Sequence, residues 1–114
     1  MKKYITDTKA KGATPIVCSL VPRNNWKDGK VAQSAGDYAK WAEESALKEK
    51  AYYINLNGLI ADKYEALGEA VVKTKLFGTD STHTLEAGAI FNAGVVAEGI
   101  NELKQCKLKK YLKK

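Results

Sequence analysis

Apolar residues along the chain fall into two short, nearly continuous runs and into longer segments where they recur every three or four positions. The continuous runs cover residues 15–21 and 51–56. A run of this kind, bounded in the first case by Pro15 and Pro22, is typical of a strand that is buried on both faces in a parallel sheet. The recurrent spacing is typical of amphipathic helices. The pattern therefore predicts alternating helices and strands.

Helices are predicted before, between and after the two strands. Their ranges are 1–11, 37–49, 58–72 and 85–103. Asp37 stands where a side chain can cap the second helix, and Asn57-Gly58 opens the third. The second helix connects the two strands as a βαβ unit. We therefore expect the strands to run parallel, with a right-handed crossover.

Each helix is expected to bury one apolar face. These faces comprise Tyr38, Trp41, Ala42 and Ala46 in the second helix, Leu59, Ile60, Tyr64, Leu67 and Val71 in the third, and Ala89, Ala93, Val96, Ile100 and Leu103 in the last. Gly88, Gly94 and Gly99 would each weaken the last helix by up to about 1 kcal/mol relative to alanine. Close approach of the helix backbone to a sheet would offset this cost.

Two polar loops, residues 22–36 and 77–84, separate these elements. The element order predicts an α/β fold with helices on both faces of a sheet, built as one domain over residues 1–114. Two parallel strands are too few for a stable sheet. Further strands are expected from elsewhere. The unpaired edge beside residues 15–21 predicts a homo-oligomer joined through that edge or through the faces left uncovered.

The formal charge of +6 is concentrated at the two ends, since the first twelve residues hold four lysines and residues 104–114 hold six. The only arginine is Arg23. Nucleic-acid surfaces favour arginine with interleaved aromatics, so we expect a solvated surface and no nucleic-acid partner. The sequence contains neither a recognisable signal peptide nor an apolar stretch of membrane-spanning length, and no membrane partner is expected.

The two cysteines, Cys18 and Cys106, do not have the spacing of a metal site or of a disulfide framework. We therefore expect no metal and no cofactor. The compartment in which the protein works is not determined by the chain itself.

Candidate chemistry is concentrated in the second polar loop. This loop contains the single histidine, His83, and Asp80 precedes it by three residues. Histidine exchanges a proton near neutral pH, and as a general base toward serine it needs its other ring nitrogen held by a carboxylate. A spacing of three in a turn can bring the carboxylate to the ring. The same pattern also describes a capping aspartate beside a surface histidine, and both interpretations stay open at this point.

Residues 78–88, Gly-Thr-Asp-Ser-Thr-His-Thr-Leu-Glu-Ala-Gly, followed by a helix that ends in Val95–Ile100, resemble the last conserved block of the GDSL/SGNH hydrolases. Within that family they are most similar to the rhamnogalacturonan acetylesterases. Residues 11–17 and the Val21-Pro22-Arg23 segment that follows them resemble the fourth strand of that subgroup and the loop after it. The resemblance extends from Tyr4 to Leu103.

This resemblance implies the C-terminal half of an SGNH domain, a partial flavodoxin-like three-layer fold that lacks the N-terminal strands. It also implies that His83 is the catalytic base and Asp80 the acid of a Ser-His-Asp triad. The family's serine lies in a Gly-Asp-Ser block near its N-terminus, and its oxyanion-hole glycine and asparagine lie in two later blocks. No serine in this chain follows Gly-Asp.

We therefore expect this chain to supply only His83 and Asp80 to an esterase that removes acetyl groups from rhamnogalacturonan, and to be inactive alone. The resemblance also suggests a secreted or periplasmic protein. The alternative is a non-catalytic binding or self-assembly module derived from the same fold.

Two residues after the first predicted strand are candidates for contact with acetylated polysaccharide. Loops at the carboxyl ends of parallel strands build the ligand crevice of such folds. Arg23 could pair with a galacturonate carboxylate, and Trp26 could stack on a sugar ring. A surface ion pair and a loop anchor are the alternative roles of these two side chains.

Overall fold

The computed structural model describes residues 1–33 and 37–113. The elements in chain order are α1 (Lys2–Ala10), β1 (Ile16–Cys18), β2 (Trp26–Lys27), β3 (Lys30–Val31), α2 (Tyr38–Lys48), β4 (Tyr52–Ile54), α3 (Leu56–Leu67), α4 (Glu69–Val71), the π-helix η1 (Val72–Leu76), α5 (Glu86–Glu102) and the 3-10 helix η2 (Lys107–Tyr111). In the part of the chain described, no helix is both long enough and apolar enough to cross a membrane.

Strands β1 and β4 form a parallel pair with Ile16 opposite Tyr52, which confirms the predicted βαβ unit. The Ser19 N–H extends the ladder by donating to the Ile54 carbonyl at 3.1 Å. The predicted strand range of 15–21 was too long. Because β4 ends at Ile54 and α3 begins shortly after it, the chain beyond Ser19 has no strand to pair with and runs toward the solvent.

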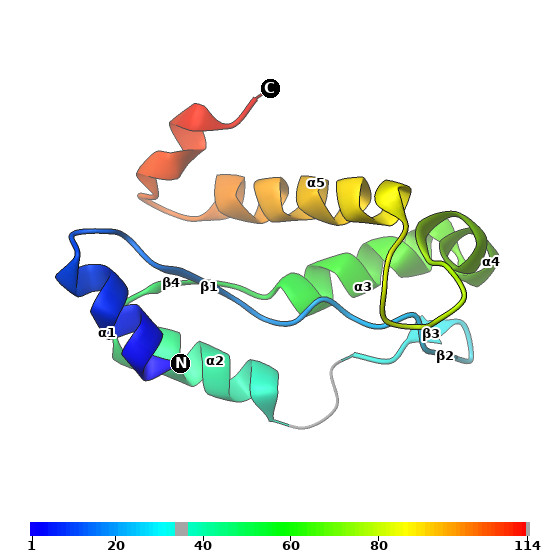
Figure 1. Ribbon diagram of the computed structural model, residues 1–114, viewed down its shortest axis with the longest axis horizontal. Helices are drawn as coiled ribbons and strands as arrows, with labels where there is room; N and C mark the ends of the chain where they lie inside the picture. The colour runs from blue at the N-terminus through cyan, green and yellow to red at the C-terminus, as the bar shows by residue number, and fades with distance from the viewer. Residues whose placement is uncertain (34–36, 114) are drawn as a thin grey trace.

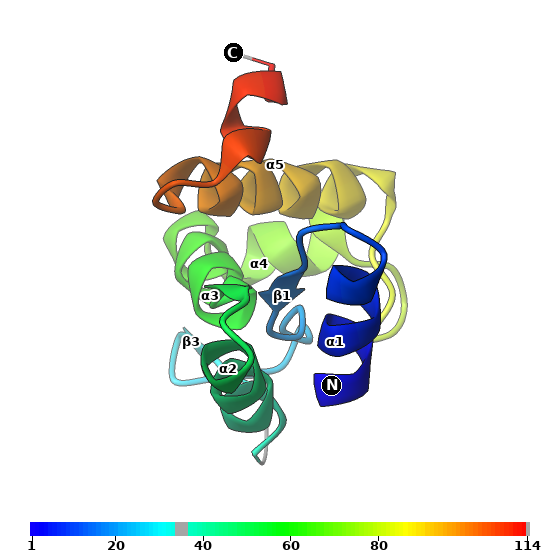
Figure 2. The same ribbon diagram turned by 90° about the vertical axis from the view of Figure 1, so that its left-hand side faces the viewer.

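Alternate residues of the sheet pack on opposite sides, which gives three layers. Ile54 belongs to a core cluster on the side of α3 and α5, and Ile16 and Cys18 pack against that cluster. Val17 belongs to a second cluster with residues of α1 and α2, and Tyr53 packs against it. α5 lies on one side of the strands and α1 and α2 on the other (Figures 1 and 2). The predicted α/β class with helices on both faces is confirmed.

Tyr64 lies at the centre of the larger cluster and is fully buried. Its hydroxyl donates to Asn92 Oδ1 at 2.8 Å. Its ring meets Phe77 edge to face at 5.8 Å and stacks on Phe91 at 5.9 Å. A buried hydroxyl needs a hydrogen-bond partner, so the bond to Asn92 fixes α3 against α5. The edge-to-face ring contact fixes Phe77 against α3.

The predicted helix 58–72 starts earlier and is broken. Asn55 caps α3 by accepting the Gly58 N–H at 3.2 Å. Gly68 has a φ of 94°, a conformation that suits glycine and ends the helix. Leu67 and Val71, predicted on the buried stripe, are therefore exposed, because the chain changes direction between them.

Only half of the apolar face predicted for α2 is buried. Ala42 and Ala46 are buried, whereas Tyr38 and Trp41 are exposed and pack on each other edge to face at 5.6 Å. α1 and the sheet contact α2 around the alanines, and the first-turn aromatics extend past that contact. The predicted Asp37 side-chain cap is absent, although the Asp37 carbonyl accepts the Trp41 N–H at 2.8 Å.

The predicted loop 22–36 contains an antiparallel hairpin, β2–β3. Asp28 and Gly29 both have positive φ, 52° and 76°, as a type I′ turn requires. The Val31 side chain is buried, and its N–H donates to Glu65 Oε1 of α3 at 3.0 Å. The Asp-Gly pair was a usable hairpin signal in the sequence. Residues 34–36 of the predicted loop lie outside the described residues.

The buried face of α5 differs from the predicted one. Ala89 and Ala93 are exposed, whereas Gly88 and Gly99 are buried. A Cβ at Gly88 would lie 2.2 Å from the Leu76 carbonyl oxygen, and one at Gly99 would lie 2.8 Å from Cγ2 of Ile54. These two glycines permit the close approach, and they turn the helix away from the predicted face.

The other half of that prediction holds. Val96, Ile100 and Leu103 pack against the larger core cluster, as the spacing predicted. Gly94 has open space around its Cβ position, so no close contact accounts for that glycine.

Candidate active site

The loop between η1 and α5 carries the predicted aspartate and histidine. Phe77 and Thr84 pair as an antiparallel bridge at its base, and the Leu85 N–H donates to the Leu76 carbonyl at 2.8 Å. Phe77 is 2% exposed, so its ring anchors this base in the core. Both ends of the loop are therefore fixed, and residues 78–83 form its tip.

Within the tip, Asp80 and His83 are directly paired. Asp80 Oδ1 accepts the backbone N–H groups of Thr82 and His83, each at 2.7 Å. Asp80 Oδ2 lies 3.0 Å from Nδ1 of the His83 ring. The spacing of three works because the aspartate closes a local turn that returns the ring to its own carboxylate.

These contacts lower the pKa of the Asp80 carboxyl to about 2. The His83 backbone N–H contributes most, followed by the His83 ring and then by the Thr82 N–H. Each donates to the ionised form and so stabilises it. Asp80 is therefore a carboxylate at neutral pH. When the Asp80 carboxylate accepts a hydrogen bond from Nδ1–H, the neutral ring is left with an unprotonated Nε2.

The pair lies open to solvent, with side-chain exposures of 54% for Asp80 and 83% for His83. In the described residues, Nε2 of His83 has no hydrogen-bond partner. The chemistry available to this geometry is proton transfer at Nε2, supported by a carboxylate at the opposite nitrogen.

The loop that follows β1 lies against this tip. The Asn24 N–H donates to the Ser81 carbonyl at 2.8 Å. Arg23 is exposed and lines a cavity of about 330 Å³ beside Tyr38. Trp26 is half-buried against the larger core cluster, and its indole N–H donates to Asn24 Oδ1 at 2.7 Å. The four predicted site residues thus lie on two segments that contact each other, residues 23–26 after β1 and the loop tip 78–83.

A polar cluster at the carboxyl ends of the strands was missed in the sequence. Ser19 and Asn57 are 5% and 3% exposed. Ser19 Oγ accepts the Asn57 N–H at 2.9 Å and donates to Asn55 Oδ1 at 3.3 Å. Polar residues that directly follow buried strands were the available signal. These bonds tie β1 to the start of α3, and they engage the Ser19 hydroxyl.

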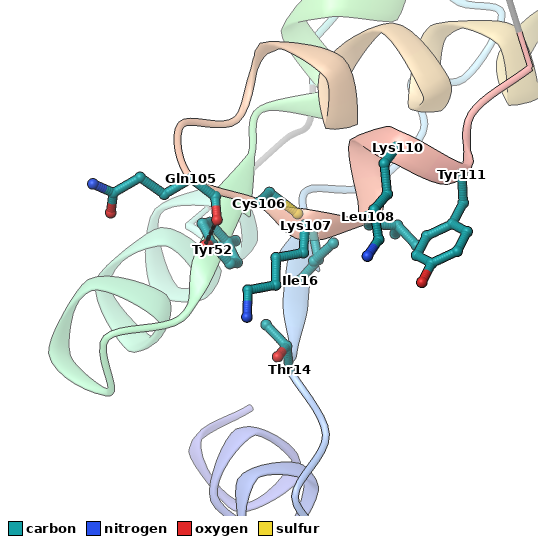
Figure 3. A pocket seen from close by; sticks show the side chains of 9 residues that line it. All are labelled: Thr14, Ile16, Tyr52, Gln105, Cys106, Lys107, Leu108, Lys110 and Tyr111. Atoms are coloured by element: carbon teal, nitrogen blue, oxygen red, sulfur yellow. Dashed lines mark hydrogen bonds between the residues drawn. The ribbon is translucent and has the colours of Figure 1, made fainter.

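A cavity of about 440 Å³ lies at the amino ends of the strands, away from the aspartate and histidine. It is lined by residues such as Thr14, Tyr52, Lys107 and Lys110 (Figure 3). The cavity that touches Asp80 is smaller, about 260 Å³, and also borders Asn24. The candidate site is therefore a shallow surface at the carboxyl edge of the sheet.

A three-layer α/β arrangement with a paired aspartate and histidine before its last long helix is typical of SGNH-type ester hydrolases. The chain is 30% identical over 107 residues to the "Probable rhamnogalacturonan acetylesterase YesY" of Bacillus subtilis strain 168, a match that covers 90% of this chain and 49% of that protein. The chain thus spans about half the length of the curated relative that it matches. No protein-family model matches it.

Among solved structures, the crystal structure of protein YxiM from Bacillus subtilis superposes with a TM-score of 0.80 and 25% sequence identity, over 97% of this chain and 30% of that one. The resemblance drawn from the sequence is confirmed by these two matches. By these matches the chain resembles part of a GDSL/SGNH hydrolase and is similar to a protein named as a probable rhamnogalacturonan acetylesterase.

Proposed function

We propose that this chain supplies the base and the orienting acid of an esterase that removes acetyl groups from rhamnogalacturonan. The observation that carries the proposal is the Asp80–His83 pair, in which Oδ2 and Nδ1 lie 3.0 Å apart. The similarity to a protein named as a probable rhamnogalacturonan acetylesterase supports the substrate class.

In this reaction a serine hydroxyl attacks the acetyl carbonyl while Nε2 of His83 takes the hydroxyl proton. Asp80 keeps the ring in the tautomer that leaves Nε2 free, and it stabilises the imidazolium that forms. The imidazolium then gives its proton to the sugar oxygen as the C–O bond to the acetyl group breaks, which releases the deacetylated sugar and leaves an acetyl-enzyme with a neutral ring. Water attacks the acetyl-enzyme with the same ring as base, and the ring returns the proton to the serine as acetate leaves. The high exposure of His83 leaves Nε2 accessible to a serine from another segment.

The serine is the part of the triad that this chain does not supply in the family's sequence context. No serine follows Gly-Asp. Ser19 is buried and hydrogen-bonded to Asn55 and Asn57. Loss of a triad member lowers the rate by several orders of magnitude. We therefore propose that the chain alone releases no acetate.

Arg23 is the substrate contact that we propose. It is exposed on the carboxyl edge of the sheet and borders a cavity of about 330 Å³. A guanidinium there can pair with the carboxylate of a galacturonate unit. Trp26 is half-buried and its N–H is engaged by Asn24, which favours the role of loop anchor over sugar stacking.

The test joins this chain to the part of the Bacillus subtilis relative that lies outside the match and measures acetate release from acetylated rhamnogalacturonan. The fusion should be active, the chain alone inactive, and the His83→Ala fusion slower by several orders of magnitude. A fusion that keeps its rate after His83→Ala would refute the assignment.

A binding measurement on the chain itself covers the case in which the fusion does not fold. Acetylated rhamnogalacturonan oligosaccharide should shift the NMR signals of His83 and Arg23, and Arg23→Ala should weaken binding by about tenfold, the loss of one charge-assisted hydrogen bond. Unshifted His83 signals at saturating oligosaccharide would count against this site.

A further inference from the structure

The tip of the Asp80–His83 loop has few attachments to the rest of the molecule. Its base is fixed through Phe77 and Thr84. Between these ends, within the residues that the structure describes, one hydrogen bond links the tip 78–83 to another element. This bond runs from the Asn24 N–H to the Ser81 carbonyl at 2.8 Å. The position of the tip relative to the sheet edge therefore depends on how Asn24 is held.

Asn24 is itself held from the core. Its side chain is nearly buried, at 9% exposure for the residue, and Oδ1 accepts the Trp26 indole N–H at 2.7 Å. Trp26 packs against the larger core cluster and begins the β2–β3 hairpin. A continuous path thus leads from the core through the Trp26 indole and Asn24 to Ser81, directly after Asp80.

We propose that Asn24 is a positioning residue that orients the Asp80–His83 pair at the carboxyl edge of the sheet, with Trp26 as its anchor. This inference rests on the proposed function for its catalytic meaning. The physical basis is the asymmetry of Asn24, whose side chain is bonded toward the core while its backbone N–H is bonded toward the loop. The local turn pairs Asp80 with His83, and the Asn24–Ser81 hydrogen bond both limits the opening of this turn and fixes where the pair faces.

The chain offers closely matched variants for the test. Asn24→Ala removes the acceptor of the indole N–H, and Trp26→Phe removes its donor while keeping an aromatic ring. Asn24→Asp keeps an oxygen acceptor at the same position and should behave as the wild type. Asn25→Ala is the control, because the neighbouring Asn25 is exposed and its side chain makes no hydrogen bond within the described structure.

Two readouts report on the pair without substrate. The first is hydrogen exchange of the Thr82 and His83 amides, which both donate to Asp80. Asn24→Ala and Trp26→Phe should speed this exchange about fivefold, the factor that corresponds to the net contribution of one hydrogen bond. The second is titration of the Asp80 carboxyl by NMR, whose midpoint should rise in both variants.

The outcomes separate cleanly. Faster exchange in Asn24→Ala and Trp26→Phe, with wild-type behaviour of Asn24→Asp and Asn25→Ala, supports the proposal. Unchanged exchange and titration in folded Asn24→Ala or Trp26→Phe would overturn it, as would equal effects of Asn24→Ala and Asn25→Ala. Because no substrate is present, these results do not depend on acetate release, and a failed esterase assay would leave them standing.

Discussion

At the scale of single residues, Asp80 holds the loop together through its own charge. Its two oxygens accept hydrogen bonds from the Thr82 and His83 backbones and contact the His83 ring. Short charge-assisted bonds of this kind stabilise the ionised form more than the neutral one. Two predictions follow from that preference, one for acid stability and one for the state of the ring.

The first concerns acid unfolding. Because the fold lowers the pKa of Asp80 from 3.8 to about 2, the carboxylate stabilises the folded protein above pH 3.8, and this contribution is lost as the pH falls toward 2. Asp80→Asn should therefore make stability less dependent on pH in this window, as measured by urea unfolding at several pH values. Asp62→Asn, at an exposed carboxylate on α3, is the control and should follow the wild type.

The second concerns the His83 tautomer. A neutral ring that donates from Nδ1 to Asp80 leaves Nε2 unprotonated, and ¹⁵N NMR distinguishes this tautomer from the one protonated at Nε2. We expect the Nδ1–H tautomer to predominate in the wild type and to lose that preference in Asp80→Ala. A wild-type spectrum dominated by Nε2–H would argue against a base role for Nε2.

At the scale of secondary structure, the glycines of α5 decide how closely the helix approaches its neighbours. Gly88 lies against the Leu76 carbonyl, which also accepts the Leu85 N–H at the base of the active-site loop. Gly99 lies against Ile54 of β4. The placement of the last helix over the sheet, and with it the start of the loop, therefore depends on the absence of side chains at these two positions.

Gly88→Ala should destabilise the protein by about 1–3 kcal/mol, because a Cβ 2.2 Å from a backbone oxygen forces the helix to shift. Gly94→Ala, in the same helix with open space at the Cβ position, should instead stabilise it by up to about 1 kcal/mol. Denaturant unfolding of both variants compares the two signs directly. Destabilisation by both substitutions would show that helix packing differs from the structure.

At the scale of the whole molecule, β1 has one paired edge and one open edge within the described structure. The Ser19 N–H points to β4, so by alternation the N–H groups of Ile16 and Cys18 point to the open edge. A groove of about 270 Å³ runs along this edge, between β1 and α1, and Tyr4 on its rim is 77% exposed. Open edges with apolar surroundings promote pairing between chains.

We propose that two copies pair through this edge, as expected for the self-assembly alternative and compatible with the esterase. Sedimentation equilibrium should give a dimer or a higher oligomer, and Tyr4→Lys should weaken it by about tenfold or more. Tyr111→Lys, a substitution of a residue that is 70% exposed on η2, should leave association unchanged. A wild-type protein that stays monomeric at all concentrations would contradict the pairing.

The sequence by itself determined the local features of this protein. The two strands, the helices and the Asp80–His83 pair follow from apolar periodicity and from a spacing of three, because the interacting groups are near neighbours in the chain. The resemblance to the GDSL/SGNH hydrolases was equally local, since it rests on the block of residues 78–88 and the strand before Arg23.

Only the tertiary structure decided how these parts meet. The buried face of α5 depends on Leu76 and Ile54, which lie outside that helix. The attachment of the loop depends on Asn24 and Ser81, which are far apart in sequence. Contacts between segments that are far apart in sequence cannot be predicted from the apolar periodicity of either segment. The direction in which His83 faces is therefore a property of the packed molecule.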